Sequence, residues 1–283
     1  MMMKTTLALA LMACGFATTA LAQQRPLVTE DPETIGSGLI LIEGGLDYQH
    51  QVTYPASGLE GNLLRLALYG VSFGVSSIAE LQIDGGPYNR LDVTARHPAP
   101  LAHELTFPGD TTHDVEDLVI ATKVRIVSEA PGRPAFGIRF ATRLPDAGNE
   151  SGLGLDTTQF YVSGLLGKTV ESVRIVGNFG FGILPDPVKG DRQNDVLTYG
   201  LSVARALHQG VELVGEINGR VNFRKDVDTP VGSETRSVMQ FGARVTHGTV
   251  RLDGVFIVGL TSLDPSYGFG GGFTWVFRGF RVP

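Results

Sequence analysis

A period-two alternation of apolar and polar residues dominates the chain after its first 22 residues. In residues 211–222, apolar side chains such as Leu213 and Ile217 fall on one face, and polar ones such as Glu212 and Glu216 fall on the other. A strand places successive side chains on opposite faces, so this period predicts strands with one apolar and one polar face.

The same pattern predicts about twelve strands along the chain. Their expected ranges are 38–51, 62–73, 78–84, 115–128, 135–144, 157–168, 173–184, 196–207, 211–222, 236–246, 249–260 and 268–280. Tight turns are expected at 74–77, 129–134, 169–172, 208–210 and 247–248. Between them lie longer links, rich in Asp, Pro, Gly and Asn, at 52–61, 85–114, 145–156, 185–195, 223–235 and 261–267.

Short and long connections therefore alternate. A secreted β-sandwich would also explain the alternating strands, but it gives no reason for all long links to lie at one end. Outer-membrane barrels have short periplasmic turns, longer external loops and an even number of strands. The sequence thus predicts an all-β fold, a transmembrane, antiparallel, up-and-down β-barrel of about twelve strands.

Composition excludes several other classes of protein. The net charge is −6 and no basic cluster occurs along the chain, which argues against a nucleic-acid partner. Beyond residue 22, charge or Gly/Pro interrupts every long apolar stretch, so no helical membrane span is expected. No glycine-rich phosphate loop and no nucleophile with a partnered base can be recognised, so we expect no catalytic residue, no cofactor and no enzyme.

The first 22 residues have the features of a signal peptide. Lys4 supplies the positive charge, 5–13 is apolar, and 20–22 (Ala-Leu-Ala) is a small-x-small cleavage site before Gln23. The competing interpretation is a lipoprotein site at Cys14, the only cysteine. The expected organisation is a removed signal peptide (1–22), a periplasmic N-terminal segment (23–37) and the barrel (38–283).

Short motifs carry a family resemblance. The opening at 25–34 (RPLVTEDPET), the run 115–125 (VEDLVIATKVR) and the strand 135–144 followed by Pro145 resemble outer-membrane proteins grouped as "MetA-pathway of phenol degradation". The hairpin at 69–83, with Glu80 after its turn, is similar to theirs as well. The resemblance implies an outer-membrane barrel of transporter type, linked by the family's name to the uptake of aromatic compounds.

If the apolar faces meet lipid, the opposite faces line the lumen, and their charged residues can be identified. The expected lumen-lining residues are Glu43, Asp47, Arg65, Glu80, Asp84, Lys123, Arg125, Arg139, Arg143, Arg174, Glu212, Glu216, Arg220, Arg244, Arg251, Asp253 and Arg278. One wall would be acidic and its neighbour basic. Such walls would either set up a field across an open pore or form ion pairs that plug a narrow barrel.

Two further features concern access to the lumen. Glycines of the lumen parity would leave space inside: Gly45, Gly137, Gly180, Gly182, Gly242, Gly259, Gly270 and Gly272. The long link 85–114 is expected either to gate the pore or to form a plain surface loop. Its His97, His103 and His113 lack the tight spacing of structural zinc ligands, so we expect no metal site.

The sequence predicts an outer-membrane channel or transporter that passes small molecules passively, aromatic or hydrophobic ones among them. The alternatives are a closed structural or adhesive barrel acting through its loops and, less favoured, a lipid hydrolase. The expected partners are the lipid bilayer, the outer-membrane assembly machinery and a small-molecule solute. The expected location is the outer membrane of a Gram-negative-type cell.

Overall fold

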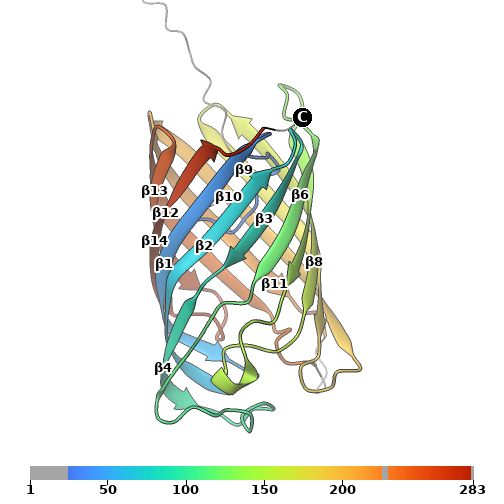
Figure 1. Ribbon diagram of the computed structural model, residues 1–283, viewed down its shortest axis with the longest axis vertical. Helices are drawn as coiled ribbons and strands as arrows, with labels where there is room; N and C mark the ends of the chain where they lie inside the picture. The colour runs from blue at the N-terminus through green and yellow to red at the C-terminus, as the bar shows by residue number, and fades with distance from the viewer. Residues whose placement is uncertain (1–24, 225–228, 282–283) are drawn as a thin grey trace, which may run out of the picture.

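The computed structural model describes residues 25–224 and 229–281, in which fourteen strands form one antiparallel sheet. The strands are β1 (Leu39–Tyr54), β2 (Leu59–Gly74), β3 (Ala79–Gly85), β4 (Tyr88–Arg96), β5 (Thr111–Asp114), β6 (Val119–Val127), β7 (Ala135–Arg143), β8 (Gln159–Val170), β9 (Val173–Pro185), β10 (Gln193–His208), β11 (Val211–Val221), β12 (Arg236–His247), β13 (Val250–Gly259) and β14 (Tyr267–Arg278). β1 pairs with both β2 and β14, so the sheet closes into a barrel (Figure 1).

The fourteen strands occupy twelve positions around the wall. β3 and β4 both pair with β2, at successive levels, so together they fill one position. β6 pairs with β3 and β5 pairs with β4, so these two share the next position. The predicted fold, a closed antiparallel barrel of twelve strands, is confirmed.

The two ends of the barrel differ. Turns at 75–78, 128–134, 171–172, 209–210 and 248–249 gather at the short-turn end, the upper end in Figure 1. Connections at 55–58, 97–110, 144–158, 186–192 and 260–266 gather at the opposite, long-loop end, together with the described residues 222–224 and 229–235 between β11 and β12. The expected long link 52–61 was wrong, because strand pairing continues to Tyr54 and Leu59 and leaves a tight hairpin turn.

The expected gating loop 85–114 was also too long. Its residues 88–96 and 111–114 form β4 and β5, which belong to the barrel wall, so the free loop is 97–110. The β4 alternation is inverted relative to most other strands, since Leu91 and Val93 point inward while Arg90 and Asp92 are exposed outside. This part of the wall therefore does not show the lipid-facing pattern by which the other strands were predicted.

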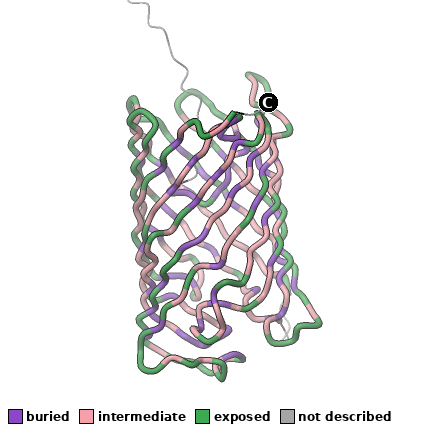
Figure 2. The backbone as a smooth tube through the Cα atoms, viewed as in Figure 1, coloured by how far each residue is buried: buried purple, intermediate pink, exposed green. Residues whose placement is uncertain are grey.

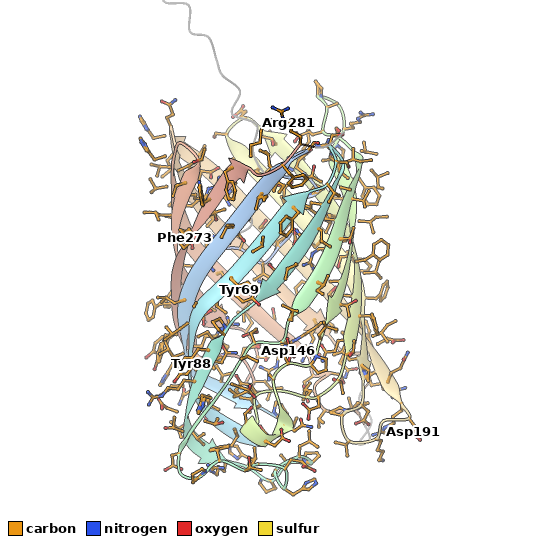
Figure 3. The ribbon with its side chains drawn as sticks, viewed as in Figure 1. Tyr69, Tyr88, Asp146, Asp191, Phe273 and Arg281 are labelled. Atoms are coloured by element: carbon orange, nitrogen blue, oxygen red, sulfur yellow. The ribbon has the colours of Figure 1, made fainter. Side chains whose placement is uncertain are left out.

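A broad outer band of the wall is apolar. Figure 3 shows side chains projecting outward along the barrel, with Phe273 at its edge, and Phe179 is 57% exposed. Other exposed members include Phe140, Phe160, Phe181, Leu201, Leu213, Phe241, Phe269 and Trp275. Burial alternates along the strands, as Figure 2 shows, and this is the outward-apolar arrangement of a barrel in lipid. Among the described residues, no helix is long and apolar enough to span a membrane.

On the β1, β2 and β4 side of the long-loop end, apolar residues lie inside instead. Val52, Leu59, Leu63, Leu91 and Val93 form one buried group, here called the mouth cluster. Leu105 and Phe107 from loop 97–110, together with Leu153 from loop 144–158, pack against it. The free part of the expected gate therefore folds onto this cluster on the β1, β2 and β4 side of the mouth.

The chain before β1 lies inside the barrel. Residues 25–36, here called the inner segment, form no helix or strand and follow the inner wall (the blue coil within the barrel in Figure 1). Its Leu27 packs with Ala204 of β10 and Val214 of β11. Its Ile35 packs with Leu41 of β1 and Val276 of β14. We expected this segment on the periplasmic side, and the structure instead places its described residues within the lumen.

Candidate functional site

The inner segment brings three acidic residues to the basic wall. The buried Lys123 ammonium lies 3.2 Å from a Glu30 oxygen and 3.0 Å from a Glu80 oxygen. The second Glu30 oxygen lies 3.0 Å from Nε of Arg139. Asp31 forms a two-pronged pair with Arg174, at 2.9 and 2.6 Å. Glu33 pairs with Arg125.

These pairs change the interpretation of the lumen charges. The strands supply an excess of bases on this side, and the segment supplies the carboxylates that neutralise them. In a water-poor interior, each of these cations would be costly without its partner. The expected basic wall therefore faces an acidic peptide rather than open water.

Side chains of the wall also satisfy the backbone of the inner segment. Both carboxylate oxygens of Glu216 accept hydrogen bonds, at 2.8 Å each, from the backbone N–H groups of Val28 and Thr29. A Glu80 oxygen accepts one from the N–H of Ile35 at 2.7 Å, and Asn178 bonds both the N–H and the carbonyl of Glu30. Because buried N–H groups need partners, these acceptors allow a chain without secondary structure to lie inside the barrel.

Glycines on the inner wall give the segment its space. A Cβ at Gly45 or Gly272 would collide with the Arg25 guanidinium, and one at Gly137 would lie 3.3 Å from Pro32. At Gly200, a Cβ would lie 3.4 Å from the Cβ of Thr29. The sequence marked the first three as space inside the lumen, and the structure shows that the inner segment fills it.

The other predicted lumen residues, apart from Arg278, form contacts within the wall, with the loops or with Arg25 of the inner segment. Arg65 binds Asp47 at 3.0 and 2.6 Å, and Arg139 also approaches Asp84 at 3.7 Å. Further contacts join Arg143 to Asp117, Arg220 to Glu234, Glu212 to Arg244 and Arg251, Asp253 to Arg25, and Glu43 to the backbone N–H of Arg25 and to Thr274. Arg278 is exposed at the end of β14.

The sequence analysis did not identify several partners of the predicted lumen residues, most of which lie outside strands. Arg25, Glu30, Asp31 and Glu33 precede β1, and Asp117 lies between β5 and β6. Arg236 begins β12 on the same parity as the predicted Arg244. The sequence does contain a signal for these ion pairs. The inner segment is acidic, and the strands with which it pairs carry basic residues.

Between the inner segment and the long loops the lumen is hollow. A cavity of about 570 Å³, the inner chamber, has Val28, Thr29 and Glu30 on one side and residues of β7 to β12 around it. A second cavity of about 260 Å³, the outer chamber, reaches Tyr54, Leu153 and Glu234. Both are lined by Arg65, Arg143, Arg220 and Arg236, which therefore stand where the chambers meet.

The three histidines of the expected gate each contact a different residue. His97 contacts Glu60 at 3.1 Å, His103 contacts its neighbour Glu104 at 3.1 Å, and His113 stacks against Tyr88. Within residues 25–224 and 229–281, no group of three or more His, Cys, Asp and Glu side chains is arranged to hold a metal ion. The predicted signal peptide and Cys14 lie outside the described residues.

The fold can be compared with solved structures. The chain is similar to an outer-membrane channel from Pseudomonas putida F1, with 12% identity, a TM-score of 0.63, and coverage of 87% of this chain and 98% of that one. A NanC porin (7% identity, TM-score 0.49, coverage 85% and 100%) and the translocator domain of the autotransporter NalP from Neisseria meningitidis (14%, 0.46, 85% and 88%) are more distant. The chain thus has the fold of an outer-membrane β-barrel, a conclusion that rests on the first of these structures.

Sequence comparison adds no family. No family model matches the chain, and no curated protein matches it. The resemblance to the phenol-degradation family therefore stays a prediction, while its coarser content, an outer-membrane barrel, agrees with the fold.

Proposed function

We propose that this protein is a passive outer-membrane channel for small molecules and that the inner segment is its internal constriction. The observation that carries the proposal is the hollow lumen, with a cavity of about 570 Å³ between the segment and the long-loop end. A barrel with a purely structural or adhesive role has no need for such a chamber. Its size lies within the range of roughly 300–1,000 Å³ found for small-molecule sites.

The contacts of the inner segment suit a movable constriction. Polar and ionic contacts hold much of it, and its apolar contacts are made by a few small groups, among them Leu27, Pro32 and Ile35. Ion pairs and hydrogen bonds can be exchanged for water when a segment leaves its site, at a smaller cost than exposing a large apolar surface. Segment release would then join the chambers to the short-turn end.

The proposed location is the outer membrane of a Gram-negative-type cell, with the apolar outer band in contact with lipid. We propose that the lumen passes and selects small molecules, and we propose no catalytic step.

A reversible crosslink tests the role of the segment. Cysteines at positions 29 and 200 would have Cβ atoms about 3.4 Å apart, close to the roughly 3.5–4.5 Å of natural disulfides. The only cysteine of the sequence, Cys14, falls within the predicted signal peptide. The double variant Thr29→Cys/Gly200→Cys can therefore be oxidised without a competing thiol in the mature chain.

We expect the oxidised double variant to conduct poorly in a planar bilayer and to gain conductance when it is reduced. The single variants Thr29→Cys and Gly200→Cys, treated in the same way, should not respond to the oxidant. Equal conductance before and after reduction would show that the segment is not the constriction. A folded, reduced protein that conducts nothing would favour the closed structural barrel.

A further inference from the structure

We infer that the junction of the two chambers is a binding site for small organic carboxylates. The inference deepens the proposed function, since it names the solutes that the lumen would select. Its residues are Arg143 on β7, Arg220 on β11 and Arg236 on β12, which line both the inner and the outer chamber. Arg220 and Arg236 are paired directly across β11 and β12, and Arg143 comes from the separate strand β7.

The arginines of the lumen differ in how far their charge is neutralised. Arg65 has two carboxylates, Asp47 at 2.6 Å and Glu116 at 3.6 Å. For Arg220, the one carboxylate within 4 Å in the described part of the chain is Glu234, at 3.8 Å. Its Nε instead donates to the backbone carbonyl of Glu234 at 2.9 Å.

Arg236 is held in a similar way. Its two terminal nitrogens donate to the backbone carbonyls of Leu263 and Thr53, at 2.7 and 2.6 Å. The nearby Asp264 carboxylate lies 3.7 Å away, and its Oδ2 already accepts bonds from Ser237 and Thr261. A carbonyl dipole orients a guanidinium but brings no negative charge to cancel it.

This arrangement presents fixed positive groups to the two chambers. Arg143 also lines both chambers, and its Nε contacts Asp117 at 2.8 Å. A planar guanidinium matches a carboxylate with two parallel hydrogen bonds, and such charge-assisted bonds are stronger than neutral ones. The occupant that fits this chemistry is a small anion bearing a carboxylate.

The remaining lining favours a compact organic body behind the carboxylate. Tyr161 and Tyr199 line the inner chamber, and the Tyr199 hydroxyl is already used in a 2.7 Å bond to Ser237. Their aromatic rings add apolar surface to the lining, against which a flat molecule would pack. Benzoate combines a carboxylate with such a body, and benzamide has the same shape without the charge.

Ligand-observed proton NMR on the refolded, detergent-solubilised full barrel tests the site directly. We expect benzoate signals to broaden in a saturable way and benzamide signals to respond far less. Arg220→Gln and Arg236→Gln should each weaken benzoate binding about tenfold or more, because a charge-assisted pair is lost. Arg90→Gln, on the exposed outer face of β4, should leave binding unchanged.

The outcomes separate this inference from the proposed function. Benzoate binding without channel conductance would support the carboxylate site and overturn the channel. Conductance with equal responses to benzoate and benzamide would overturn the site and leave the channel standing. Should either arginine variant fail to fold, raised salt offers a second test, since screening must displace a charge-held ligand from the unmodified protein.

Discussion

Two regions of this barrel wall have opposite polarity although the same kind of alternating strand builds both. In most of the wall, charged side chains such as Lys123 and Glu216 point inward, and aromatic ones such as Phe179 point outward. In β4, at the long-loop end, Leu91 points inward while Arg90 and Asp92 point outward. The alternation of a strand defines two faces, but the surroundings decide which face is polar.

The difference in polarity follows from the surroundings of each face, which are lipid, water or other parts of the protein. The apolar outer band suits lipid, and the charges behind it have the polar inner segment as a partner. On β4 the outer face carries the charged residues of an aqueous surface, while Leu105, Phe107 and Leu153 cover the inner face of this part of the mouth. A single rule of apolar-outward strands therefore fails on this side of the mouth.

The largest effect should come from the charged interior of the short-turn half. Lys123 is 1% exposed and Glu80 is fully buried, so Lys123→Met would leave a buried carboxylate without its cation. We expect the free energy of unfolding to fall by about 3–5 kcal/mol, as is typical when one partner of a buried pair is removed. Urea titration of the refolded protein, followed by the fluorescence of its single tryptophan, Trp275, measures this loss.

A compensating variant serves as the control for that experiment. Adding Glu80→Gln to Lys123→Met removes the stranded charge and should recover part of the lost stability. If Lys123→Met alone cost less than about 1 kcal/mol, the value of an exposed pair, the interior would be open to water rather than closed by the inner segment.

The difference in polarity between the outer faces of β4 and of the lipid-facing strands can be tested with one substitution in each region. Ile217, on the apolar parity of β11, lies near the middle of its strand, and Ile217→Arg should destabilise the barrel by about 2–4 kcal/mol if that level is the bilayer midplane. Thr94, on the exposed face of β4, should accept Thr94→Arg with a change within about 0.5 kcal/mol. Both are measured by refolding into lipid vesicles, and equal losses would refute this difference.

The sequence predicted the repeated features of this molecule well. Period-two alternation, which each strand carries locally, predicts about twelve strands and the inward parity of residues such as Glu80 and Glu216. The alternation of short and long connections predicts that these strands form a barrel. β4 was not predicted, because its alternation is inverted and lies among the prolines of an apparent loop. Local pattern could not show that this stretch continues the wall beside β2.

The inner segment could not be placed from local pattern either. It has no secondary structure, so no period marks it, and its position depends on partners that are mostly distant in the sequence, such as Lys123 at a separation of 93 and Glu216 at 187. What the sequence did hold was complementarity, an acidic stretch at Glu30, Asp31 and Glu33 and basic strands in need of partners. A search for complementary charges along the chain, in addition to the search for period-two alternation, would have indicated which side of the lumen the inner segment covers.

The smallest effect is expected at the long-loop end, in the connection 186–192. The Asp186 carboxylate accepts bonds from the backbone N–H groups of Val188 and Lys189 and from Arg192. Burial alone would raise its pKa, but the Val188 N–H, the Arg192 guanidinium and the Lys189 N–H lower the pKa of Asp186 below its ordinary value.

A lowered pKa in the folded state means that this carboxylate stabilises the loop above its unfolded pKa of about 3.9 and loses that effect as the pH falls through the lower folded-state value. We expect the amide resonances of Val188 and Lys189 to shift with a midpoint below about 3.9, and Asp186→Asn to abolish the transition. Global stability should change by less than about 0.5 kcal/mol, because a loop outside the sheet can open while the barrel stays closed. A midpoint at or above the ordinary value would show that the loop is not held by this carboxylate, and the long-loop end would then be less ordered than the short-turn end.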